Sequence, residues 1–260
     1  MITWLASYPK SGNTWVRSLL SSYLYTKDGN FNFQLLKKIT QFPNEKSFDY
    51  FLKDKRDIKK VSSYYIAAQE KINLQGDNIL LKTHSALCSI EKNPFTNKNN
   101  TKAVIYIVRD PRNIITSLSN HYSQSIDESY KFITNTNKIL TNDKWGKESF
   151  GIASVLGSWA DHYNSWINIK FAPILLIKYE NLVNDTKNVF IEILNFLSKY
   201  MYIKIDDKKI LNTLTTCSFE NLSSMEKSEG FFEAVTSKKD NKKIDFFYLG
   251  KKNNWENLIS

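Results

Sequence analysis

Residues 8–15, Tyr-Pro-Lys-Ser-Gly-Asn-Thr-Trp, contain the first group of side chains suited to chemistry. Gly12 lets the backbone approach a ligand closely, and a helix that begins here points its free N–H groups at that ligand. Lys10 adds a positive charge, and Ser11 and Thr14 add hydroxyl donors. The stretch therefore predicts a binding site for an anion such as a phosphate.

This loop differs from the P-loop of nucleoside triphosphate enzymes, G-x-x-x-x-G-K-S/T. Its lysine, Lys10, precedes Gly12, and Asn13 stands where the P-loop lysine would follow that glycine. The arrangement that holds magnesium is therefore missing from this stretch, and we expect the phosphate to be bound without a metal. An ordinary tight turn between a strand and a helix is the alternative interpretation.

Lys82 and His84 follow the apolar residues 79–81. Residues two apart on an extended chain point to the same side, so these two side chains can converge on one small volume. A histidine beside a lysine is held neutral, which suits a general base for a hydroxyl. A surface histidine at the end of a strand is the alternative.

Arg109 follows another apolar run, residues 103–108, and begins a third group. Asp110 and Pro111 suit the cap and the first turn of a helix. Ser117 lies eight residues after Arg109, about two helical turns along, where its hydroxyl can reach the same phosphate. A purely structural Arg109–Asp110 cap is the alternative.

The elements that must position these groups are short apolar strands. Residues 2–7, 79–83 and 103–108 form near-continuous apolar runs, and a segment with one apolar helical face, residues 15–24, follows the first. This order is typical of an α/β fold with a central parallel sheet flanked by helices, in which ligands bind at the carboxyl ends of the strands. Three strand ends thus direct cations to one edge of the sheet.

The composition agrees with one globular domain spanning residues 1–260. The net charge of +10, from 36 Lys and Arg against 26 Asp and Glu, favours anionic partners. Cys88 and Cys217 have no metal-ligand spacing, which argues against a zinc site or a disulfide framework. No apolar run reaches membrane-spanning length, and no leader precedes the first expected strand, so we expect a cytoplasmic protein.

Several stretches together resemble the cytosolic-type sulfotransferase family, which uses 3′-phosphoadenosine 5′-phosphosulfate (PAPS) as sulfuryl donor. YPKSGNTW at 8–15 resembles the family's 5′-phosphosulfate loop, and VRDPRNIITS at 108–117 resembles its 3′-phosphate motif. Further matches, in the family's order along nearly the whole chain, are LLKTH at 80–84, GSWADH at 157–162, KYENL at 178–182 and CSF at 217–219.

The resemblance implies a three-layer fold like that of the P-loop NTPases. It also implies that Trp15, Tyr179 and Phe219 contact the adenine, while Arg109 and Ser117 hold the 3′-phosphate. The full set of expected donor-binding residues is Lys10, Ser11, Gly12, Asn13, Thr14, Trp15, Arg109, Ser117, Tyr179, Phe219, Gly250, Lys251 and Lys252.

The implied mechanism is in-line transfer of a sulfuryl group to an acceptor hydroxyl, with no metal. His84 takes the proton from the hydroxyl, and Lys10, with Lys82, neutralises the bridging oxygen that leaves with adenosine 3′,5′-bisphosphate (PAP). The three expected catalytic residues are therefore His84, Lys10 and Lys82. His121 and His162 are expected to be packed histidines without a catalytic role.

The sequence departs from the family in the last motif, RKGxxGDWKN. The matching stretch is residues 248–257, in which Gly250, Trp255 and Asn257 agree but the arginine and the first lysine are absent. We expect Lys251 and Lys252 to supply the charge from a shifted place. The chain ends at Ser260, before the family's C-terminal dimer motif, so the oligomeric state stays open.

Residues 223–252 are expected to form a mobile lid or a solvated connector. The expected acceptor is a small metabolite or a carbohydrate, with no nucleic acid partner and no membrane span. The alternative functions are a nucleotide or nucleoside kinase-like P-loop enzyme, a nucleic-acid-binding module, and a homologue that binds the donor without turning it over.

Overall fold

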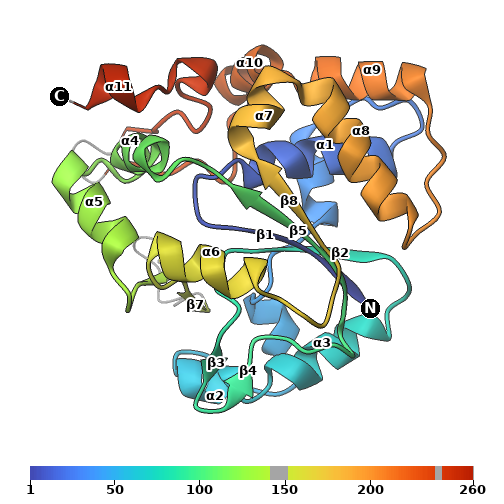
Figure 1. Cartoon of the computed structure of the whole chain (residues 1–260), viewed down its shortest axis with the longest axis vertical. Helices are drawn as coiled ribbons and strands as arrows, with labels where there is room; N and C mark the ends of the chain where they lie inside the picture. Colours follow the sequence, from blue (N-terminus) through green and yellow to red (C-terminus); the bar gives the residue numbers. More distant parts are fainter. Residues whose placement is uncertain (141–151, 238–241, 260) are drawn as a thin grey trace.

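A sheet of four parallel strands in the order β2-β1-β5-β8 forms the centre of the molecule (Figure 1). The computed structural model describes residues 1–140, 152–237 and 242–259. The sheet consists of β1 (Ile2–Ser7), β2 (Ile79–Thr83), β5 (Thr101–Val108) and β8 (Ile174–Lys178). Two short antiparallel pairs lie outside it: β3 (Ser89–Ile90) with β4 (Asn93–Pro94), and β6 (Ile139–Leu140) with β7 (Ser154–Val155). The predicted α/β fold with a central parallel sheet is confirmed.

Helices connect the strands and cover both faces of the sheet (Figure 1). In chain order the helices are α1 (Asn13–Tyr25), η1 (Phe33–Lys38), η2 (Glu45–Phe48), α2 (Ile58–Ser62), α3 (Tyr65–Asn73), α4 (Pro111–Tyr122), α5 (Ile126–Thr134), α6 (Trp159–Ile167), α7 (Tyr179–Asn184), α8 (Thr186–Ser198), α9 (Asp207–Thr216), α10 (Phe219–Glu229), η3 (Gly250–Lys252) and α11 (Trp255–Leu258).

Side chains of the two central strands alternate between two apolar cores, as the pleat of a strand requires. Leu5 and Ile105 pack in the core that α1, α8, α9 and α10 close. Trp4 and Val104 pack in the opposite core, under α3 and α6. The expected three-layer arrangement is thus present, and the assignment of residues 1–260 to a single domain stays a prediction.

The observed strands differ slightly from the predicted ones. The third begins at Thr101 instead of residue 103, and the sheet has a fourth strand, Ile174–Lys178. Thr101 can lie in a buried strand because its hydroxyl accepts a hydrogen bond from the indole of Trp4, at 3.1 Å. A buried threonine is tolerated when its hydroxyl is hydrogen-bonded. The strand can therefore begin before the first residue of the apolar run.

Helix α1 is buried on more than its apolar face. Arg17, Ser18, Ser21 and Ser22, which lie off the predicted face, are each at most 2% exposed. The hydroxyl of Ser18 donates to the carbonyl of Thr14, and the hydroxyls of Ser21 and Ser22 also donate to backbone carbonyls. The serines are therefore satisfied, and the buried guanidinium of Arg17 is left as the unusual feature of this helix.

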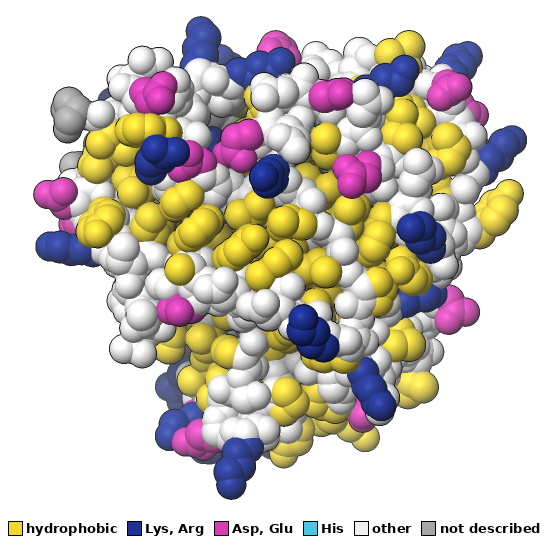
Figure 2. Space-filling view, viewed as in Figure 1, with side chains coloured by type: hydrophobic (Ala, Val, Ile, Leu, Met, Phe, Trp, Pro, Cys, Tyr) yellow, Lys and Arg dark blue, Asp and Glu magenta, His cyan; other side chains and the backbone are white. Residues whose placement is uncertain are grey.

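The surface offers no helix, within the described part of the chain, that has both the length and the apolar character needed to cross a membrane. Hydrophobic side chains gather across the middle of the face shown in Figure 2. On the edge strand β8, Ile174, Leu175 and Leu176 are partly exposed. The site described next lies at the carboxyl ends of the strands, where α1, α4 and α7 begin.

Candidate active site

A cavity of about 1110 Å³ lies at the carboxyl edge of the sheet. Most of the residues predicted for the site line it: Lys10, Gly12, Asn13, Thr14, Trp15, Lys82, His84, Arg109, Ser117, Tyr179, Phe219, Gly250 and Lys251. The other two do not: Ser11 is fully buried in the loop, and Lys252 is exposed outside the cavity.

The loop before α1 has a backbone that requires glycine at one point. Gly12 precedes the helix with φ of 97°, and a Cβ there would lie 2.5 Å from the ring of Tyr179. The loop and the aromatic ring therefore touch across the cavity wall. No acidic side chain lies in the first turn of α1, so the free N–H groups at its start remain suited to an anion.

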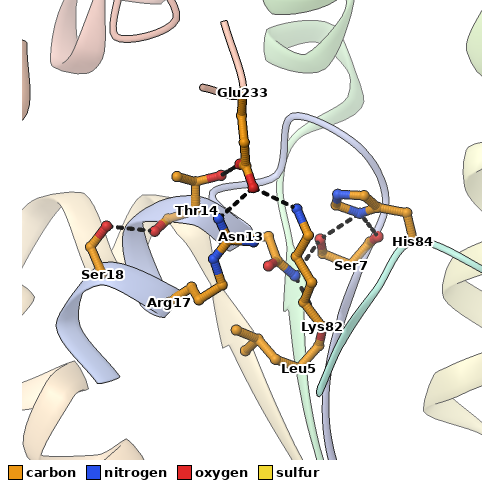
Figure 3. A network of polar contacts seen from close by, with 9 residues as sticks. All are labelled: Leu5, Ser7, Asn13, Thr14, Arg17, Ser18, Lys82, His84 and Glu233. Carbon is orange, nitrogen blue, oxygen red and sulfur yellow. Dashed lines mark hydrogen bonds and ion pairs between the residues drawn. The ribbon is translucent and has the colours of Figure 1, made fainter. Parts of the chain in front are cut away.

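Asn13 is turned into the protein. Its side-chain amide donates to the carbonyl of Leu5 at 3.1 Å and to the hydroxyl of Ser7 at 3.2 Å (Figure 3). The side chain is thereby used to tie the loop to β1. Its side-chain amide is therefore not available to a ligand, and only the backbone N–H of Asn13 could make the predicted contact.

The Arg109 side chain contacts the backbone of Lys10 in the loop before α1. The Lys10 ammonium lies 4.0 Å from the centroid of the Phe246 ring, and burial, with the nearby charge of Arg109, lowers the pKa of Lys10 to about 7. Arg109 donates from Nη1 to the Lys10 carbonyl at 2.8 Å and stacks 4.2 Å from the centroid of the Tyr179 ring. Its buried Nε has no hydrogen-bond partner among the described residues. A donor held this way suits an incoming anion.

His84 has its two ring nitrogens in different surroundings. Nδ1 lies 2.8 Å from the carbonyl oxygen of Ser7, and since a carbonyl only accepts, Nδ1 carries the proton (Figure 3). Nε2 is therefore the basic nitrogen. Burial, with the charge of Lys82, lowers the pKa of His84 to about 3, so the ring is neutral at pH 7. This lowered pKa agrees with the expectation of a neutral histidine beside a lysine.

The other two histidines differ in their surroundings. His162 is fully buried, donates from Nε2 to the His84 carbonyl at 3.0 Å and accepts from the Tyr106 hydroxyl at 2.8 Å. It is a satisfied core histidine, as predicted. His121 lines the cavity with its ring edge on to Phe246, at 5.7 Å between centroids, and burial lowers its pKa to about 3.

Aromatic rings form another wall. Trp15 and Tyr179 are in edge contact at 6.2 Å between centroids, and the Trp15 indole donates to the carbonyl of Cys217 at 2.9 Å. Gly250 lies against Phe219, since a Cβ on Gly250 would be 2.8 Å from that ring. The three residues expected at the adenine thus line one cavity from three separate elements, α1, α7 and α10. At Gly12, against Tyr179, and at Gly250, against Phe219, a larger side chain would not fit.

The C-terminal segment is anchored to α4. Asn253 accepts from the Thr116 hydroxyl at 2.6 Å and donates to the carbonyl of Asn113 at 3.0 Å. This placement brings Lys251 to the cavity beside the helix that carries Ser117, whereas Lys252 lies outside. Of the two lysines expected to replace the missing cations, Lys251 alone is at the cavity.

Glu233 is the residue of this site that the sequence did not indicate. Its Oε1 lies 2.5 Å from Arg17 Nη2 and 3.1 Å from Lys82 Nζ, and its Oε2 accepts from the Thr14 hydroxyl at 3.3 Å (Figure 3). Desolvation would raise the pKa of this carboxyl, but Lys82 and Arg17 outweigh it and lower the pKa to about 2. No motif marks Glu233, because it lies in an irregular segment 151 residues after Lys82.

The described residues form no cluster of side chains suited to bind a metal ion. Within residues 1–140, 152–237 and 242–259, no three side chains of His, Cys, Asp or Glu gather as metal ligands would. The cavity walls fit an anionic nucleotide better. Two glycines lie against aromatic rings, and the buried Arg109 Nε is unpaired among the described residues.

Comparisons with known proteins point to one family. The sulfotransferase domain profile matches residues 2–260. Sulfotransferase 2A1 of Mus musculus is 33% identical over 132 residues, 49% of this chain and 41% of the relative. Sulfotransferase 1B1 of Canis lupus familiaris is 26% identical over 262 residues, 98% of this chain and 77% of the relative. The chain thus spans less than half of the first relative's length and about three quarters of the second's.

Solved structures agree on the fold. A mouse sulfotransferase complexed with PAP superposes with a TM-score of 0.58 at 21% sequence identity, over 99% of this chain and 77% of that one.

Proposed function

Because the chain belongs to the sulfotransferase domain family, we propose that it moves a sulfuryl group from PAPS to an acceptor hydroxyl. The observation that carries the proposal is the meeting, in one cavity, of cations from three strand ends with a neutral histidine. His84 has Nδ1 committed to Ser7, so its basic Nε2 is the nitrogen that can take a proton.

The 5′ end of the donor is assigned to the loop before α1. Its backbone N–H groups and the Thr14 hydroxyl suit a phosphate, and Lys10 and Lys82 suit the adjoining charge. The 3′-phosphate is assigned to Arg109, Ser117 and Lys251. Support comes from the burial of the Arg109 guanidinium, whose Nε has no partner in the described part of the chain.

The base is assigned to the aromatic wall. Trp15, Tyr179 and Phe219 offer faces and edges to a purine, and stacking needs no polar partner specific to the base. Gly12 and Gly250 keep the backbone close to two of these rings. Of the other residues predicted for the donor, Asn13 would act through its backbone, while Ser11 and Lys252 do not line the cavity.

When bound, PAPS supplies an activated sulfuryl group. His84 Nε2 accepts the proton of the acceptor hydroxyl as the new bond between oxygen and sulfur forms. Lys10, with Lys82, neutralises the bridging oxygen as its bond to sulfur breaks and the electron pair stays on that oxygen. We assign these three residues as catalytic, with a small metabolite or a carbohydrate as the acceptor.

A calorimetric titration with PAP, with ADP as the control and without magnesium, tests the donor site. Micromolar binding of PAP with much weaker binding of ADP is the expected result. Equal affinity for the two nucleotides would favour a kinase-like enzyme, because ADP lacks the 3′-phosphate. A protein that binds PAP but transfers sulfuryl groups from PAPS to no member of a broad hydroxyl panel would be a donor-binding, non-catalytic homologue.

A further inference from the structure

Arg17 is a buried cation with no role in the assignments above. Its side chain is 2% exposed, and its Nη2 lies 2.5 Å from the Glu233 carboxylate. Its Nε has no hydrogen-bond partner among the described residues. Burying a guanidinium is costly unless its charge and its donors are used. A single carboxylate uses only part of them.

The carboxylate of Glu233 lies among groups assigned to the 5′ end of the donor. Thr14 and Arg17 are three residues apart on α1, so they share a helix face. Lys82 comes from the end of β2 and contacts the same carboxylate oxygen as Arg17 (Figure 3). A carboxylate oxygen accepts hydrogen bonds from the same cationic and hydroxyl groups as a phosphate or sulfuryl oxygen does. Glu233 therefore has the contacts that an oxyanion of the donor would have.

The charges around this point are unbalanced. Arg17 and Lys82 place two buried cations on one carboxylate, and burial lowers the pKa of Lys82. The phosphosulfate end of PAPS carries more negative charge and more acceptor oxygens than a carboxylate does. It would satisfy both cations and the unpaired Nε better than Glu233 does.

Glu233 can leave this position without disturbing the core. Its side chain is 21% exposed. The residue two positions before it, Phe231, is 7% exposed and packs against Phe33 and Phe246, which anchors the segment. The carboxylate is thus held by polar contacts on an anchored backbone.

We propose that Arg17 binds the 5′-phosphosulfate end of the donor, in the place that the Glu233 carboxylate holds here. This inference rests on the proposed function. It makes Glu233 an internal competitor of the donor and adds Arg17 to the donor-binding residues.

The test is calorimetric titration of PAP into four proteins: the wild type, Glu233→Gln, the double variant Arg17→Gln with Glu233→Gln, and a control. The control, Asp54→Asn with Arg56→Gln, removes the same two charges from an exposed ion pair. Removing the competing carboxylate should tighten PAP binding about tenfold, and removing Arg17 from that background should weaken it about tenfold or more. The control should bind PAP like the wild type.

Two results of the PAP titration would overturn the inference. If Glu233→Gln and the double variant bind PAP equally, Arg17 serves only as the partner of Glu233, while the proposed function stands. If none of the proteins, wild type included, binds PAP, the inference and the proposed function fail together. Thermal unfolding of each protein verifies the fold, and Arg17→Met with Glu233→Gln replaces the double variant if that variant does not unfold cooperatively.

Adenosine 5′-monophosphate, titrated into the same proteins, tests the placement at the 5′ end. Loss of Arg17 should weaken the binding of this nucleotide and of PAP by similar factors. A loss seen with PAP alone would mean that Arg17 holds the 3′-phosphate, which would overturn the placement.

Discussion

The ring of His84 is oriented by a backbone carbonyl and, among the described residues, by no acidic side chain. The Ser7 carbonyl accepts from Nδ1 at 2.8 Å, and His162 donates to the carbonyl of His84 at 3.0 Å. Both the tautomer and the position of the ring are therefore fixed by buried groups. A histidine with its pKa lowered to about 3 is uncharged throughout the physiological range, with its single proton on Nδ1.

Replacing His84 with alanine should lower kcat by roughly a hundredfold or more, the usual scale for a general base. PAP affinity should change little, because the assigned donor contacts remain. Turnover with PAPS and a reactive hydroxyl, together with PAP calorimetry, measures the two effects. His121→Ala is the matched control, since it removes another buried histidine of the cavity, and it should lose far less turnover. Near-normal turnover in His84→Ala would remove the histidine from the mechanism.

Lys10 should make donor binding depend on pH. Its pKa is lowered to about 7, so above this pH the free protein carries mostly neutral Lys10, and binding of an anion must take up a proton. PAP affinity should therefore fall as the pH rises from about 7.5 to about 9.5, by up to about tenfold per unit, in a range where the phosphates stay ionised.

Calorimetry in buffers of different ionisation enthalpy measures this proton uptake directly. Lys10→Arg is the control, because a guanidinium stays charged throughout the range and should flatten the pH dependence. An affinity that does not vary with pH in the wild type would contradict the prediction.

How far the site could be predicted depends on where each residue lies. Lys10, Lys82 and Arg109 lie at or just after the ends of apolar strands. A strand end is visible in a sequence because burial imposes a pattern on the strand. Glu233 follows no strand, because the apolar residues on either side of it form none. It reaches the same cations only after the chain has folded back from α10. The sequence predicts that Asn13 lies in the loop. It does not predict that the side chain points inward, because that direction depends on contacts with β1.

At the scale of elements, the start of α1 depends on contact between Gly12 and Tyr179. The glycine has φ of 97°, and a Cβ would lie 2.5 Å from the ring carried by α7. Gly76 offers a comparison, because its φ is 141° and a Cβ there would meet nothing within 4 Å. An alanine at either position meets backbone strain, but only an alanine at position 12 also clashes with a ring. Comparing the two variants therefore distinguishes the effect of strain from the effect of the clash.

Gly12→Ala should lower both stability and PAP affinity, whereas Gly76→Ala should lower stability alone. Backbone strain of this kind costs about 1–3 kcal/mol in the free energy of unfolding. Displacement of Tyr179 should add a loss of PAP affinity of about tenfold, the size of one lost stacking or close contact. Urea unfolding and calorimetry give the two quantities, and unchanged PAP binding in Gly12→Ala would show that the ring is not part of the donor site.

Helix α10 positions the segment that carries Phe246. Glu226, 8% exposed, accepts hydrogen bonds from the backbone N–H groups of Phe246 and Phe247, at 2.8 and 2.9 Å. Glu226→Ala should lower the free energy of unfolding by about 1–3 kcal/mol, because two buried donors lose their acceptor. Glu229→Ala, on the exposed part of the same helix, should change it by less than about 0.5 kcal/mol. Equal values for the two variants in urea unfolding would contradict this account.

At the scale of the whole molecule, the layered fold was easier to predict than the segment over the site. The sheet follows from apolar runs whose residues alternate between two cores. The segment 223–252 has no such pattern: it is held by aromatic packing of Phe231 and Phe247 and by polar contacts of Glu226 and Glu233. Its residues 238–241 lie outside the described ranges. The choice between a lid and a connector for this segment therefore stays a prediction.

Hydrogen exchange with and without PAP distinguishes the two. PAP at a concentration of about 100 Kd should stabilise the protein by ~2.7 kcal/mol and raise Tm by about 5–11 °C. A lid that closes on the donor should gain protection in α10 and in residues 242–252 beyond this global increase. Helix α3, which packs in the opposite core, is the internal reference. Protection that rises equally in both places would make the segment a connector, because a connector shares only the stabilisation of the whole fold.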